Sequence, residues 1–229
     1  GGVGSIKAAG RVSVLTNRSI INATVNASAG LISGNSSGGV TGTFTGGSDA
    51  AASVQRLVNI SSRARVGTAD AVAIAGFVIS GTESKPVLIR AVGPTLGAAP
   101  FNVTGALAAP RLELFRGATS IGTNAGIGTN RTAIDAAGQR AGAFALGAAG
   151  TDAAILTTLA PGNYTAVVSS ATTATGVALV EVYDLSAAAA GQKLLNISTR
   201  ASAGTADNTL IAGFVVPPGS SKRVVIRGV

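Results

Sequence analysis

The chain has 229 residues, of which 46% are hydrophobic, 11% are charged and only 3% are aromatic. This composition excludes a disordered tail, and a chain of this length can bury a sizeable core in one or two domains. Cys and His are both absent, which excludes disulfides, thiolate nucleophiles, imidazole bases and the usual zinc ligands. We therefore expect neither an enzyme nor a bound cofactor or metal.

The net charge of +8 would suit a polyanionic partner. The basic residues are spread along the chain, however, and the tightest grouping is Arg63 with Arg65. Aromatic residues are not interleaved with them, as single-stranded nucleic-acid binders require. The apolar stretch 71–79 is far shorter than the roughly 20 residues of a membrane-spanning helix. We therefore expect no nucleic-acid partner and no membrane span.

Residues 1–56 alternate apolar and polar residues in the segments 11–15, 20–27 and 39–45. This alternation is typical of strands, because residues i and i+2 lie on one face. The segments are too few and too rich in Gly and Ser to build a core by themselves. Residues 34–38 fit the Gly-x-Ser-x-Gly nucleophile pattern, but no His is available to complete a triad, so we expect a Gly/Ser turn there.

An internal repeat with an offset of 137 residues organises the rest of the chain. Residues 57–92 match residues 194–229 without a gap, with 21 identities over 36 positions by direct count. A unit of this length is too long for a solenoid repeat and suits a domain. We therefore predict a complete unit over 57–193 and the first three strands of an incomplete second copy over 194–229.

Within the unit, short apolar segments are separated by turn-forming residues, which predicts strands rather than helices. The predicted strands are 57–62, 72–80, 86–92, 111–115, 153–158, 163–169 and 177–183. Only 130–147 and 186–193 could hold a helical turn, and the glycine-rich residues 122–128 lack the spacing of a phosphate loop. We predict an all-β fold, an antiparallel, jelly-roll-like β-sandwich, in which Phe77 and Phe214 are buried equivalents.

Two resemblances follow from these segments. Residues 57–64, Gly67-Thr-Ala-Asp, residues 74–81 and residues 87–96 resemble a repeat of secreted, often very long, bacterial surface proteins of unassigned function. Residues 107–184 are weakly similar to the β-sandwich modules of secreted proteases known as pre-peptidase C-terminal domains. Neither family supplies catalytic residues. The resemblances imply export, a location outside the cell or on its surface, and a structural or binding role.

Charged residues recur at equivalent positions of the two copies: Asp70 with Asp207, Arg63 with Arg200, and Arg90 with Arg227. We interpret them as structural, with the aspartate bonded to its Gly-Thr turn or paired with an arginine at the sheet rim.

Nine of the eleven asparagines begin an Asn-x-Ser/Thr sequon, which is a hypothesis for glycosylation. Polar alternation on a strand face gives the same pattern without sugars. The possible glycosylation sites that we name are Asn17, Asn22, Asn26, Asn35, Asn102 and Asn130.

Three strands with an open apolar face need partners for their edge amides and carbonyls. We hypothesise that residues 1–56 of one subunit complete the sheet left open by 194–229 of the next, a head-to-tail strand addition. The alternative is a fragment whose remaining strands are not included. The predicted subunit interface comprises Val12, Val14, Ile21, Val25, Val40, Phe44, Val224 and Ile226.

The function hypothesis is a structural subunit of an extracellular filament or surface assembly, a homopolymer of this chain. The alternative is a secreted module that binds a surface polysaccharide or another surface polymer. Sugar binders usually present exposed Trp or Tyr, and this chain offers only Tyr164 and Tyr183, both within apolar strand patterns. The alternative is therefore the weaker of the two.

Overall fold

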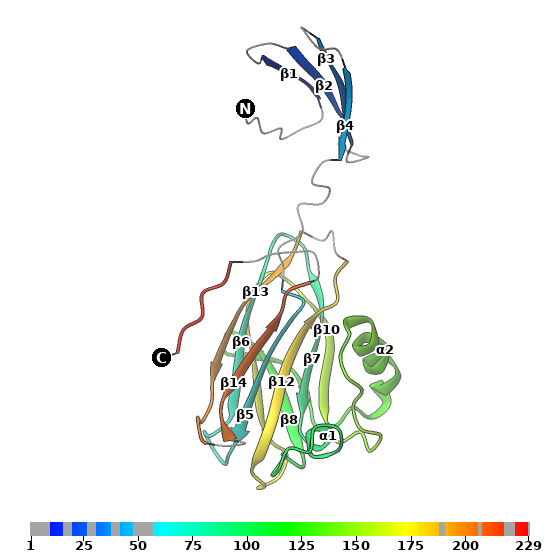
Figure 1. Cartoon of the computed structure of the whole chain (residues 1–229). Coiled ribbons are helices and arrows are strands. Elements are labelled where there is room, and N and C mark those ends of the chain that lie inside the picture. The colour runs from blue at the N-terminus through cyan, green and yellow to red at the C-terminus, as the bar shows by residue number, and fades with distance from the viewer. Residues whose placement is uncertain are drawn as a thin grey trace. The chain divides into compact units, whose positions relative to one another are not determined.

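A computed structural model describes residues 57–187, 191–205, 208–217 and 223–228, together with four strand backbones between residues 10 and 47 (Figure 1). The chain divides into two compact units, Gly1–Gln55 and Arg56–Val229. The first unit is an antiparallel meander in the order β1-β2-β3-β4. Its strands are β1 (Gly10–Leu15), β2 (Ile20–Asn26), β3 (Leu31–Ser37) and β4 (Gly42–Gly47).

The Gly/Ser stretch expected as a turn in this unit is part of a strand instead. Gly34 to Ser37 lie in β3, where Gly34 pairs with Ala23 of β2 and with Phe44 of β4. The turn prediction was therefore wrong for these residues. Strand propensity depends strongly on context, and pairing on both sides overrides the weak preference of Gly and Ser for strands.

The second unit is an antiparallel β-sandwich, which confirms the predicted all-β class. One sheet, here called the β5 sheet, has the order β10-β7-β12-β5-β14; the other, the β6 sheet, has the order β13-β6-β11-β8-β9. The β5 sheet comprises β5 (Asn59–Val66), β7 (Lys85–Val92), β10 (Ala153–Leu159), β12 (Gly176–Asp184) and β14 (Ile211–Val215). The β6 sheet comprises β6 (Ala73–Ser80), β8 (Pro110–Arg116), β9 (Thr119–Asn124), β11 (Gly162–Ser170) and β13 (Lys193–Arg200).

The core lies between the two sheets and follows the alternation of the strands. In β6 every second residue is buried, and Phe77 at 2% exposure stacks on Tyr164 with ring centroids 5.6 Å apart. Each of the seven predicted apolar segments overlaps one of these strands, although 57–62 and 72–80 begin before β5 and β6 do. The strand β9 was not predicted, because its residues were read as part of a glycine-rich loop. Its pairing with β8 places Thr123 opposite Glu113.

Two helices accompany the sandwich, α1 (Pro94–Gly97) and α2 (Arg131–Ala141). The longer helix α2 falls within the predicted segment 130–147 and ends at Gly142, which adopts the left-handed conformation with φ of 70°. Its buried residues Ile134 and Ala137 share a second apolar cluster with Leu88 of β7. In Figure 1 this helix lies at the β10 end of the β5 sheet. Among the described residues, no helix is long and apolar enough to cross a membrane.

Candidate assembly interface

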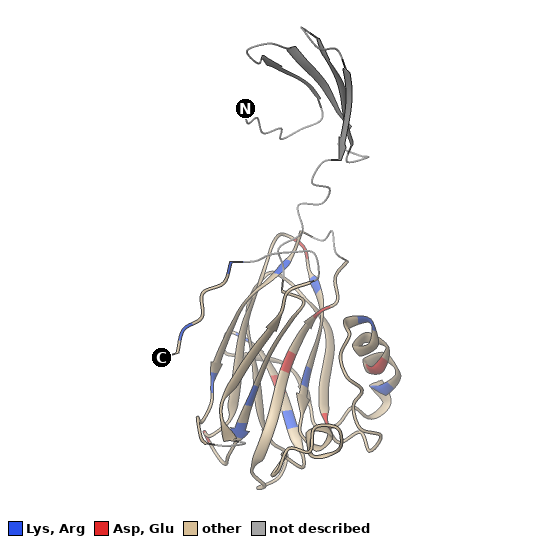
Figure 2. Cartoon of the chain, in the orientation of Figure 1, with Lys and Arg blue, Asp and Glu red and all other residues tan. Residues whose placement is uncertain are grey.

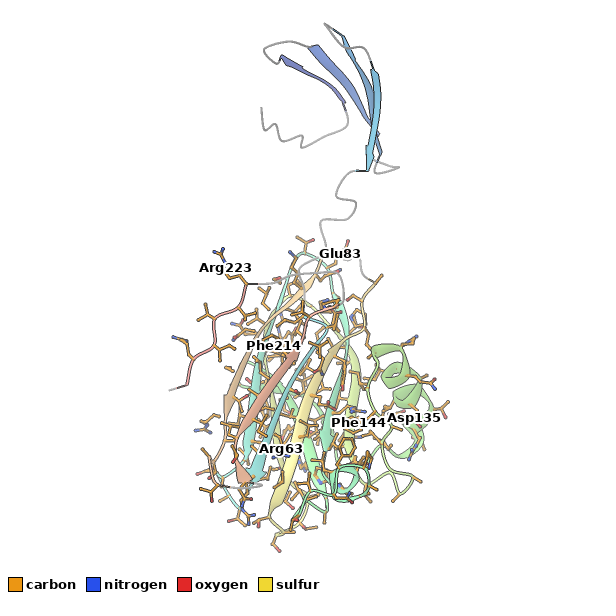
Figure 3. All side chains as sticks on the ribbon, viewed as in Figure 1. Arg63, Glu83, Asp135, Phe144, Phe214 and Arg223 are labelled. Atoms are coloured by element: carbon orange, nitrogen blue, oxygen red, sulfur yellow. The ribbon has the colours of Figure 1, made fainter. Side chains whose placement is uncertain are left out.

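The two edge strands from the second copy, β13 and β14, leave the sandwich open along one side. Each of them pairs with a strand of the first copy, β13 with β6 and β14 with β5, and each ends its sheet. Figure 3 labels Phe214 on β14. Its ring is 40% exposed, whereas the equivalent Phe77 is 2% exposed. The prediction that these two rings are equally buried was therefore wrong for Phe214.

The physical reason is the missing neighbour on one side of β14. Phe77 lies on an inner strand, between β11 and β13, whereas Phe214 lies on the last strand of its sheet. Phe214 pairs with Ile60, a core residue with no exposed surface, so both side chains face the interior between the sheets. The open edge therefore exposes an aromatic ring that belongs to the interior of the fold.

Residues 223–228 correspond to part of β7 in the first copy but lie outside any strand (Figure 1). The predicted interface residues Val224 and Ile226 are 40% and 79% exposed, and Val225 between them is 84% exposed. The structure thus forms two of the three strands expected over 194–229. It also presents an apolar segment to solvent beside charged Arg223, which Figure 3 labels.

The remaining predicted interface residues belong to the N-terminal unit. Val12 and Val14 lie on β1, Ile21 and Val25 on β2, and Phe44 on β4, whereas Val40 lies outside the described residues. The expectation that residues 194–229 lack strand partners was wrong in one respect. On one side of both β13 and β14, the partner comes from the same chain, and among the described strands none pairs with their outer sides.

Arg90, one of the recurring charged residues of the first repeat, is buried inside the fold. Arg90 is 1% exposed and binds Glu181 through Nε–Oε2 at 2.9 Å and Nη2–Oε2 at 2.5 Å. Its guanidinium also lies 4.3 Å from the ring centroid of Phe144 and 5.3 Å from that of Tyr183. The Tyr183 hydroxyl donates to Glu181 Oε1 at 2.7 Å. Burial, and then the Glu181 carboxylate, raise the pKa of Tyr183 well above its ordinary value.

A second buried ion pair and a buried aspartate add to the buried polar groups around Arg90. Lys85 Nζ lies 2.8 Å from Asp184 Oδ2, and both side chains are inaccessible to solvent. Asp152, 1% exposed, accepts from the Gly93 amide at 2.8 Å and from the Thr95 hydroxyl. These bonds hold the chain at the start of α1. Figure 2 shows acidic and basic residues on the strands within the sandwich. Pairing gives Arg90 with Glu181, and Lys85 with Asp184, a structural role.

Backbone hydrogen bonds close the turn of the recurring Gly-Thr-Ala-Asp segment in both copies. The Gly67 amide donates to the Ala71 carbonyl at 2.6 Å, and the Gly204 amide donates to the Asn208 carbonyl at 3.1 Å. A Cβ on Gly67 would lie 2.7 Å from Ala71 Cβ, so only glycine fits there. Asp70 is exposed, and its counterpart Asp207 lies outside the described residues. The recurrence is therefore explained by the turn.

The named sequons fall into three groups. Asn102 and Asn130 are exposed, with Asn130 preceding α2. Asn22 and Asn26 lie on β2 and Asn35 on β3, while Asn17 lies outside the described residues. Glycosylation stays a prediction for all six.

Two surface hollows of the described residues lie beside α2. The larger, about 780 Å³, lies between the end of α2, β10 and residues 184–187, and the smaller, about 290 Å³, lies between β9, β10 and α2. Within the described ranges, no three acidic side chains gather as metal ligands. Tyr164 and Tyr183 are 3% and 6% exposed, which leaves neither ring free to stack on a sugar.

No family model, no curated protein and no solved structure matches this chain. The fold class is an antiparallel β-sandwich. The strands β13 and β14 each end one of its sheets and together form the open edge.

Proposed function

We propose that the chain is a structural subunit of an extracellular filament or surface assembly that polymerises head to tail by β-strand addition. The observation that carries the proposal is the open edge, where Phe214 faces the interior of the sandwich and is nevertheless 40% exposed. A further strand that covers this ring lowers the free energy of the assembly, because the apolar surface of the ring then leaves water.

The sequence of this edge supports the proposal. Natural edge strands are usually protected by lysine, proline or a bulge that prevents pairing with another chain. The residues of β14 are Ile-Ala-Gly-Phe-Val, with no charge and no proline. Val215 at its end is 46% exposed. Such a strand is a template for addition, and the strands of residues 1–56 in the next subunit are the donors that we propose.

Two variants test this proposal, and a third serves as control. Val215→Lys places a charge on the open edge, and deletion of residues 1–28 removes β1 and β2 of the proposed donor segment. Leu156→Lys is the matched control, because Leu156 is 40% exposed on β10, at the opposite edge of the same sheet. We expect filaments in negative-stain micrographs of the intact chain and of the control, and only single particles of the other two variants.

Each outcome separates one part of the proposal. Filaments that persist after deletion of residues 1–28 would overturn β1 and β2 as the donor strands. Filaments that also persist in Val215→Lys would overturn strand addition at this edge. An intact chain that stays as single particles at every concentration would overturn the structural function itself.

A further inference from the structure

The two strand pairs that join the copies of the repeat share the same register over four residue pairs, and β13 departs from it at a register shift between Leu194 and Ile197. In one pair Phe77 of β6 lies opposite Ile197 of β13, and in the other Phe214 of β14 lies opposite Ile60 of β5. Ile197 and Phe214 are the second-copy counterparts of Ile60 and Phe77, each 137 residues further on. The phenylalanine of each copy therefore faces the isoleucine of the other, so that the seam between the copies has approximate two-fold symmetry.

Close contacts repeat across the seam in the same way. Gly76 lies opposite Ser198, and Gly213 lies opposite Ser61. A Cβ on Gly76 would lie 2.5 Å from Ser198 Oγ, and a Cβ on Gly213 would lie 2.9 Å from Ser61 Oγ. A side chain at either glycine would displace the hydroxyl of the facing serine of the other copy. The seam thus has matching small and polar residues in both directions.

The seam is also self-complementary in sequence. Residues 59–63 and 74–78 of the first copy are identical to their counterparts in the second copy, except that Thr199 stands in place of Ser62. A β5–β6 edge therefore presents the same surface to any copy of the repeat, in the same chain or in another. Because the surface is self-complementary, it can bind the same surface of a second copy.

We infer that the β5–β6 edge of one molecule is the docking site for β13 and β14 of a second molecule of this chain. Each molecule then offers one donor pair of strands and one acceptor edge, so the exchange continues from molecule to molecule. This contact is distinct from strand addition at the outer side of β14, and it rests on the proposed function only for its setting in a filament. Pairing within one chain competes with it, since tethering supplies an effective concentration in the millimolar range.

The absence of cysteine in the native chain makes a disulfide test clean. One full-length variant carries Ser61→Cys and a second carries Gly213→Cys. In a disulfide the Cβ of one cysteine lies about 3 Å from the sulfur of the other, which the 2.9 Å separation of this pair matches. The two variants are mixed under denaturing and reducing conditions, refolded together at high concentration and then oxidised.

Non-reducing electrophoresis then measures the covalent species. We expect a band at twice the chain mass of 22.1 kDa from the mixture, and the same result from the symmetry-related mixture of Gly76→Cys with Ser198→Cys. The control mixture is Gly213→Cys with Ser120→Cys, which is exposed on β9, at the edge of the β6 sheet opposite to β13. We expect its dimer band to be no stronger than that of either variant alone.

The outcomes distinguish this inference from the proposed function. If neither seam mixture gives more dimer than the control, exchange between molecules is wrong, even where micrographs show filaments. If both seam mixtures give dimers and no filament forms, the exchange stands and the filament function falls. A Ser61→Cys/Gly213→Cys double variant checks the register: oxidised in the folded state and then unfolded and refolded without reductant, it should keep its seam locked within one molecule and give no dimer.

Discussion

Residues 87–89 and 224–226 are nearly identical segments in contrasting surroundings. Val87, Leu88 and Ile89 on β7 have no exposed surface, because β10 and β12 flank them and the second sheet and α2 cover their faces. Their counterparts Val224, Val225 and Ile226 are 40%, 84% and 79% exposed. The difference shows that burial here is set by the neighbouring strands, and the sequence of the segment by itself does not determine it.

The largest expected effect comes from the arginines at the ends of these segments. Arg90→Met leaves the Glu181 carboxylate buried without its ion-pair partner, and should lower the free energy of unfolding by about 3 to 5 kcal/mol. Arg227→Met changes an exposed side chain and should stay within about 0.5 kcal/mol. Urea unfolding measures both. Similar losses in the two variants would mean that residues 223–228 are covered by a partner in solution.

The equivalent residues Phe77 and Phe214 extend this comparison of the two copies to the core. Phe77→Ala removes a fully buried ring that stacks on Tyr164, at a cost of about 3 to 5 kcal/mol. Phe214→Ala removes a ring that is 40% exposed, and its cost should be about 1 to 2 kcal/mol. The same denaturation experiment, carried out on dilute monomer, gives the difference. Equal costs would contradict an open edge at β14.

Alkaline unfolding tests the buried polar cluster of the first copy. The pKa of Tyr183 lies above its ordinary value of 10.0, so the folded chain keeps a phenol proton that the unfolded chain releases. The contribution of Tyr183 to the free energy of unfolding is therefore fully present below pH 10. It falls as the pH rises above 10, by about 1.4 kcal/mol for each pH unit. Tyr183→Phe should flatten this slope in denaturant titrations between pH 9 and 11. An unchanged slope would show that another group is responsible.

Local pattern was sufficient to predict the strands of the first repeat. The alternation in β6 and the apolar run in β7 correctly indicated strands, and the Ala-rich segment contained α2. Local pattern failed where pairing decided the outcome. Gly122 belongs to β9 because β8 offers it a partner, and the exposure of Phe214 depends on a strand that does not lie beside it.

The buried charge pairs were equally hidden from sequence reasoning. Arg90 and Glu181 are 91 residues apart in the chain, and only the pairing of β7 with β12 places them opposite one another. The recurrence of Arg90 at Arg227 indicated a structural role but could not identify the partner. The seam could be predicted from the sequence in part, because the repeat shows which residues of the two copies are equivalent. That β5 and β6 form its edges could be learned only from the structure.

The two-fold character of the seam sets a rule of parity for any array of this repeat. A copy has one β5–β6 edge, and one seam uses it completely, so copies can satisfy these edges only two at a time. An even number of copies can close every such edge, whereas an odd number leaves one copy unmatched. Adding a single repeat to an even number of copies would therefore leave one β5–β6 edge without a partner copy, whatever the total length of the array.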